Sequence, residues 1–210
     1  MVAEAVAPLW EAVLGLDAAG SAQEAAEPAP GGDAAAWLAA EGRCDRPWLL
    51  AARSAAPEAV ERARAEGFLV MSLGEAFTAF EADVAYVPDV ETMAAHGEAL
   101  LARARFLLAP SNPHQGGWAS GRSLASWAAD IPALARFEAE GRLLRFDLWT
   151  GSAGGLFGDP DGAEIPARLL AAASARTIRT LGSALPEPSV TGFEGLRPVG
   201  ARGESIQPYD

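Results

Sequence analysis

The loop from Pro110 to Ser123 carries the residue types best suited to chemistry. It holds His114, the amides of Asn112 and Gln115, the guanidinium of Arg122, several hydroxyls and three glycines. Imidazole titrates near neutral pH, so His114 is a candidate base or phosphate contact. The amides are candidate substrate contacts, and Arg122 is a candidate phosphate contact. The alternative is a surface loop whose Asn and Ser side chains cap a helix.

A second candidate is Asp89, which follows the predicted strand 83–87. Its carboxylate could hold a ribose hydroxyl or a metal ion, or accept a proton from a reacting hydroxyl. Alternatively, Asp89 caps the helix that begins directly after it. His96 lies inside that predicted helix, where a packed or solvated histidine is the expected role.

Three further candidates belong to the predicted strand 142–148 and the residues after it. Arg145 is a candidate phosphate contact, and Asp147 could line the same crevice. Trp149 offers a face on which a base or sugar could stack, or it closes the core. Asp159 and Asp161 lie in a turn-forming stretch and are not spaced like a metal-binding motif at a strand end. No metal site is expected, and no cofactor is expected either.

These candidates would share one edge of a sheet if the chain alternates strands and helices. Gly-X-Gly-X-X-Gly and Walker sequences do not occur, which argues against a dinucleotide oxidoreductase or a P-loop ATPase. Helices of 10 to 17 residues between buried strands predict right-handed crossovers. The expected fold is α/β, with a mostly parallel, Rossmann-like sheet of about five strands covered by helices on both faces. Its ligand crevice would lie beyond the carboxyl ends of the strands. The predicted strands are 47–52, 68–72, 83–87, 105–109 and 142–148, and the predicted helices are 57–66, 91–103, 124–140 with a break near Pro132, and 165–181 with Arg176 and Arg179 near its end.

The flanks of this domain differ from it in composition. Residues 1–16 place apolar side chains at helical spacing, which predicts an amphipathic helix that packs on its own domain or contacts a protein partner. Residues 17–40 are rich in Ala, Glu, Pro and Gly and are interpreted as a linker. The Rossmann-like domain is expected over 41–185, followed by an irregular C-terminal arm over 186–210.

Charge and hydropathy restrict the partners. The formal net charge is −12, and residues 1–100 hold 17 acids against 5 arginines, so binding to nucleic acid is not expected. Every fixed cation is an arginine, since the chain has no lysine. The single cysteine, Cys44, cannot form an internal disulfide. No apolar run approaches the roughly 18 residues of a membrane span, and no signal peptide is evident, so a cytoplasmic location is expected.

From Pro47 to Gly182 the chain resembles bacterial Rossmann-like glycosyltransferase domains that are distantly similar to sialyltransferases. The similar segments, in order, are 48–52, 83–89, 104–110 running into 113–114, 141–146 and 175–182. The resemblance implies a sugar-nucleotide site at the carboxyl edge of the sheet. The sequence departs from the family at three places. Where the family would have glycines after the first strand, this chain has Ser54-Ala55-Ala56, and where it would have an asparagine after the second strand, this chain has Gly74. Where it would have an acidic, glycine-rich turn, this chain has Ser183-Ala184-Leu185-Pro186.

The leading hypothesis is therefore a glycosyltransferase-like domain that binds a nucleotide sugar or related anionic ligand, either active or catalytically degenerate. The alternative is a non-catalytic interaction or scaffold protein of the same shape. A nucleotide-processing hydrolase would need a further acid near His114. Convergence of His114, Asp89 and Arg145 on one pocket would favour the enzyme, and a crevice filled by Trp118 or Trp149 would favour the scaffold.

Overall fold

A computed structural model describes residues 34–116, 118–119, 121–146, 163–173, 175–182 and 207–208. The predicted N-terminal helix and most of the predicted C-terminal arm lie outside these residues. The described helices are α2 (Ala34–Ala39), α3 (Pro57–Ala65), α4 (Val90–Ala95), α5 (Gly97–Arg103), α6 (Leu124–Trp127), α7 (Pro132–Ala139) and α8 (Glu164–Ala172), with 3-10 turns η1 (Ala40–Asp45) and η2 (Gly74–Thr78). The strands are β1 (Trp48–Ala51), β2 (Leu69–Leu73), β3 (Ala82–Tyr86), β4 (Ala104–Pro110), β5 (His114–Gln115), β6 (Trp118–Ala119), β7 (Leu143–Phe146), β8 (Ile178–Leu181) and β9 (Gln207–Pro208).

The main sheet has the order β7-β4-β3-β2-β1-β8-β9, and each of its pairings is parallel. The predicted α/β class and the mostly parallel sheet are confirmed. Strands β1 and β2 are buried along their whole length, as expected for strands covered on both faces. A hairpin of β5 and β6 forms a separate antiparallel pair.

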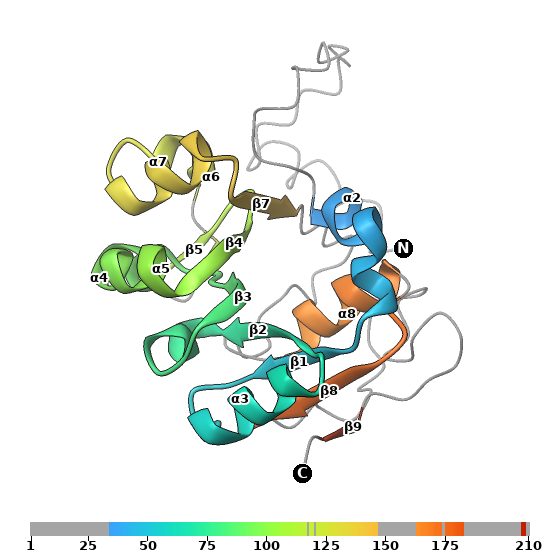
Figure 1. Ribbon diagram of the computed structural model, residues 1–210. Helices are drawn as coiled ribbons and strands as arrows, with labels where there is room; N and C mark the ends of the chain where they lie inside the picture. The colour runs from blue at the N-terminus through green and yellow to red at the C-terminus, as the bar shows by residue number, and fades with distance from the viewer. Residues whose placement is uncertain are drawn as a thin grey trace, which may run out of the picture.

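Helices cover both faces of this sheet (Figure 1). From β1 the chain moves along the sheet in one direction, to β2, β3, β4 and then β7. Because each crossover between parallel strands is right-handed, the helices of these crossovers, α3 to α7, lie on the same face. Val60 of α3 and Phe137 of α7 are among the fully buried residues there. The crossover from β7 to β8 returns along the opposite face, where α8 and α2 pack on Trp48, Met71 and Tyr86. Helix α2 forms within the last residues of the predicted linker.

Two predicted helices differ from the structure for local reasons. The predicted helix 165–181 is too long: α8 ends at Ala172, and Ile178–Leu181 forms β8, which pairs with β1. Arg179 therefore lies in a strand and not at a helix end. The predicted helix 91–103 breaks into α4 and α5 at His96, whose φ of −119° and ψ of 21° are not helical. Directly after the break, Gly97 lies so close to α7 that an added Cβ would stand 2.9 Å from Cβ of Ala133.

Among the described residues, no helix is long and apolar enough to cross a membrane.

Candidate functional site at the carboxyl edge of the sheet

The polar loop after β4 is tied to the carboxyl ends of both neighbouring strands. The backbone N–H of Ser111 donates to the carbonyl of Phe146 at the end of β7 (3.0 Å), and that of His114 donates to the carbonyl of Pro88 after β3 (2.8 Å). His114 also forms an isolated parallel bridge with Asp89. The loop predicted to carry a site thus lies at the predicted edge, and it brings His114 beside Asp89.

His114 is a polar side chain at this edge that is buried. It is 5% exposed, and its Nδ1 atom is buried without a hydrogen-bond partner. A buried polar atom left without a partner costs about 1–3 kcal/mol, so such atoms in proteins usually meet a ligand, an ion or a water molecule. Nδ1 of His114 is therefore a hydrogen-bonding position that a bound molecule could satisfy if the groups that cover this atom move aside.

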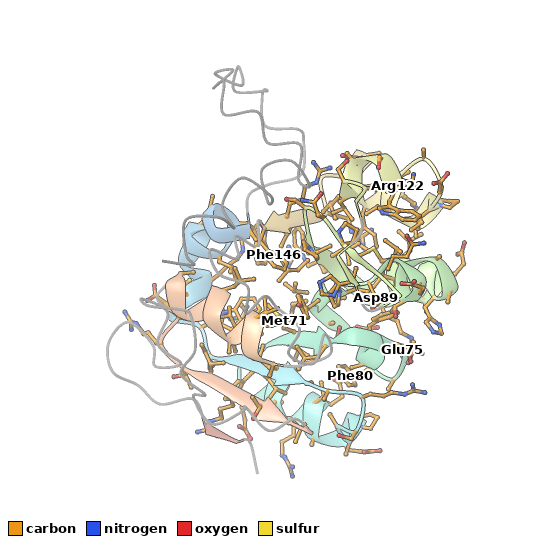
Figure 2. The ribbon with its side chains drawn as sticks, turned by 180° about the vertical axis from the view of Figure 1, so that it is seen from behind. Met71, Glu75, Phe80, Asp89, Arg122 and Phe146 are labelled. Atoms are coloured by element: carbon orange, nitrogen blue, oxygen red, sulfur yellow. The ribbon has the colours of Figure 1, made fainter. Side chains whose placement is uncertain are left out.

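Asp89 acts as the cap of α4. Its Oδ1 atom accepts from the backbone N–H of Thr92 at 2.7 Å, which is the structural role weighed against a catalytic one. Two residues later, Glu91 accepts from the backbone N–H of Gly116 at 2.7 Å. This bond fastens the hairpin of β5 and β6 to α4. Figure 2 labels Asp89, which follows β3, and Glu75, which follows β2.

Neither candidate arginine is directed at His114. Arg122 donates to Asp130 on the loop between α6 and α7 at 2.7 Å, and its guanidinium stacks 3.9 Å from the ring centroid of Trp127. Figure 2 shows Arg122 beside α6 and α7, apart from Asp89. Arg145 is paired with Glu138 of α7, on the helix-rich face. Arg145 thus joins β7 to α7, and Arg122 joins the loop before α6 to the loop after it.

The remaining predicted site residues divide into two groups. Asn112 and Gln115 are exposed on the same loop as His114, and Gln115 pairs with Trp118 in the hairpin. Asp147 and Trp149 lie outside the described residues, and so does the side chain of Trp118. Within the described part of the chain, the structure brings His114 and Asp89 together and leaves Arg145 with Glu138.

A charged cluster that the sequence analysis missed lies at the same edge, after β1 and β2. Glu75 of η2 accepts from Nη1 of Arg53 at 2.6 Å, and its other carboxylate oxygen lies 3.7 Å from Nε2 of His96. The side chain of Arg53 is 76% exposed. The only sequence signal was the position of Arg53 directly after a predicted strand, because its partner is 22 residues away.

The strand order reverses between β1 and β8, the place where open parallel sheets commonly bind ligands. Here the two following loops touch. Ser54 Oγ donates to the carbonyl of Gly182 at 2.8 Å, and a Cβ on Gly182 would lie 2.8 Å from the backbone nitrogen of Ala55. Ser54 and Gly182 therefore hold the loops after β1 and β8 in contact at this position.

No family model matches the chain, and neither the curated proteins nor the solved structures include a match to it. Among the described residues, no group of three or more His, Cys, Asp or Glu side chains is placed to hold a metal ion.

Cys44 is expected to react slowly with alkylating reagents. Its thiol donates to the carbonyl of Leu38, and burial, followed by the charge of Asp45, raises the pKa of this thiol. Because the unfolded thiol ionises first, the folded state should lose stability as pH rises through the unfolded pKa of about 8.5, and the loss should end at the folded pKa. Iodoacetamide labelling against pH should show a higher midpoint for the folded chain than for the chain in urea. Equal midpoints would contradict the assigned environment.

Proposed function

We propose that the protein is a catalytically degenerate, glycosyltransferase-like domain that binds a nucleotide sugar at the carboxyl edge of its sheet. The observation that supports this most is the buried Nδ1 atom of His114, which lacks a partner at that edge. A sugar hydroxyl, or a hydrogen-bonding group of a base, would satisfy it once the loop that buries this atom shifts. A cytoplasmic location belongs to the same proposal, since nucleotide sugars are available there.

Arg53 is the phosphate contact that the geometry favours. It follows β1, and His114 lies beside β3 and β4, so two to three strand spacings, roughly 10–15 Å, separate them along the edge. A nucleoside diphosphate sugar is long enough to contact both Arg53 and His114. The Arg53–Glu75 pair is largely exposed, and such pairs contribute about 0–1 kcal/mol. A diphosphate, with its greater charge, can therefore replace the carboxylate of Glu75.

Binding without catalytic turnover is consistent with the hydrogen bonds that the carboxylates near His114 make. Transfer of a sugar requires a base that takes the proton of the acceptor hydroxyl. Asp89 already accepts a backbone N–H at the start of α4, and Glu91 accepts that of Gly116. His114 thus has neighbouring carboxylates that are engaged elsewhere, and it serves in this proposal as a ligand contact.

A ligand screen tests the proposal. We expect a UDP-linked or CMP-linked sugar, or the free nucleotide, to raise the unfolding temperature, since a ligand at 100 times its Kd stabilises the folded state by about 2.7 kcal/mol. Arg53→Ala should weaken that binding. The matched control is Arg136→Ala, which removes a similar exposed ion pair, with Glu140, on α7.

The scaffold alternative is favoured by a different observation. Arg53 at this edge is paired with a carboxylate, and so are the two predicted phosphate contacts, Arg122 and Arg145, which lie away from His114. If no nucleotide or nucleotide sugar shifts the unfolding temperature at millimolar concentration, the donor-site proposal fails and the interaction role is supported.

A further inference from the structure

The outer edge of β8 is occupied by a strand from the C-terminal end of the chain. On its inner side β8 pairs with β1: the carbonyls of Thr177 and Leu181 accept from the backbone N–H groups of Trp48 and Ala52, each at 2.9 Å. Backbone groups alternate in direction along a strand, so the polar groups of Ile178 and Thr180 face outward. There β9 runs parallel to β8, and it lies beside β8 in Figure 1.

As far as the structure describes it, this outer strand has two residues, and the second has no backbone N–H to add to the ladder. The two residues are Gln207 and Pro208. The register pairs Arg179 with Gln207, which places Gln207 between the outward groups of Ile178 and Thr180. Gln207 can therefore donate to one and accept from the other. The ladder formed by these described residues has few bonds, and such a ladder opens at low cost.

We propose that the outer edge of β8 is a strand-accepting surface, and that the C-terminal segment of a second copy of this chain can occupy it in place of the chain's own segment. Each copy carries both the acceptor edge and the complementary strand, which is the condition for exchange of an element between protomers. An uncovered edge strand presents unpaired N–H and C=O groups, so the edge favours an occupied state. The chain's own segment is present at the edge at an effective concentration in the millimolar range. The segment of a second copy therefore competes with it when the protein concentration approaches millimolar.

The substitution Gln207→Pro removes the donor of β9 from the full chain. We expect β9 to detach once the bond from the Gln207 N–H to the Ile178 carbonyl is lost. The Thr180 amide, which faces outward, then also loses the carbonyl of residue 207, and its hydrogen exchange should become about tenfold faster. The amide of Arg179 faces β1 and serves as the internal control that stays protected. An unchanged exchange rate at Thr180 would overturn the proposal, and circular dichroism of the variant shows whether the sheet is retained.

Supply of the strand in trans is tested on the same variant. A labelled peptide of residues 201–210 should bind the Gln207→Pro chain and slow exchange at Thr180 again, whereas the same peptide with proline at position 207 should not. The wild-type chain should bind the peptide about tenfold more weakly, since its own segment competes. Sedimentation should also show dimers of the wild-type chain as its concentration approaches millimolar. A peptide that fails to bind the opened edge, or a wild-type chain that stays monomeric, would overturn the exchange between copies.

Discussion

Replacing Gly182 with alanine is expected to lower the free energy of unfolding by about 2–4 kcal/mol, because strain and a steric clash add. Gly182 has a φ of +73°, a conformation that residues with a Cβ rarely adopt. The new Cβ would also lie 2.8 Å from the backbone nitrogen of Ala55 and 2.5 Å from Oγ of Ser54. The hydroxyl can rotate away, but the backbone of Ala55 must shift. Urea denaturation followed by circular dichroism measures the loss.

Gly141→Ala provides the matched control for this substitution. Gly141 has a similar φ of +66°, but no atom lies within 4 Å of the position of its added Cβ. It should therefore lose only the conformational part, about 1 kcal/mol. The difference between the two variants isolates the contact between the loops after β1 and β8. If both variants lose the same stability, those loops do not touch in solution.

Trp48→Ala should destabilise the chain by about 3–5 kcal/mol, a large part of the 5–15 kcal/mol that stabilises a typical domain. Trp48 is fully buried in β1, between Leu69 of β2 and Ile178 of β8. Its indole N–H donates to the carbonyl of Arg43 at 3.0 Å. Removal of the ring leaves a cavity under α2 and α8, and the carbonyl loses its donor. Chemical denaturation followed by far-ultraviolet circular dichroism provides the measurement.

Trp48→Phe separates the apolar contribution of the ring from its hydrogen bond. Phenylalanine retains most of the buried apolar area, so this variant should lose about 1–2 kcal/mol less than the alanine variant. A loss below about 1 kcal/mol for Trp48→Ala would contradict the central position assigned to β1.

The strands with strong local signals were predictable from the sequence. Short apolar runs between Pro and Gly gave β1 and β2 to within a few residues, since buried parallel strands need nearly continuous apolar sequence. Strand β8 was missed because the helical pattern of α8 runs into it through Ala-rich sequence. The β-branched residues Thr177, Ile178 and Thr180 favoured a strand there, and pairing with β1 decided the outcome.

Only part of the candidate site was predictable, because some of its features are local in the sequence and others depend on contacts between distant residues. The loop with His114 was recognisable because it follows a strand and is rich in polar side chains. The burial of its Nδ1 atom was not, since this depends on packing against the segment after β3. The pairs Arg53–Glu75 and Arg145–Glu138 involve separate elements, and no spacing in the sequence indicates which arginine is already paired.

A comparison of wild type with His114→Leu tests the site most directly. Leucine is close in volume to histidine and lacks its nitrogens. In the absence of ligand we expect this variant to be at least as stable as the wild type, because a buried atom without a partner has been removed. A UDP-linked or CMP-linked sugar at millimolar concentration should then stabilise the wild type alone, as measured by thermal unfolding and calorimetry. Equal stabilisation of both chains, or of neither, would contradict a sugar-nucleotide site at His114.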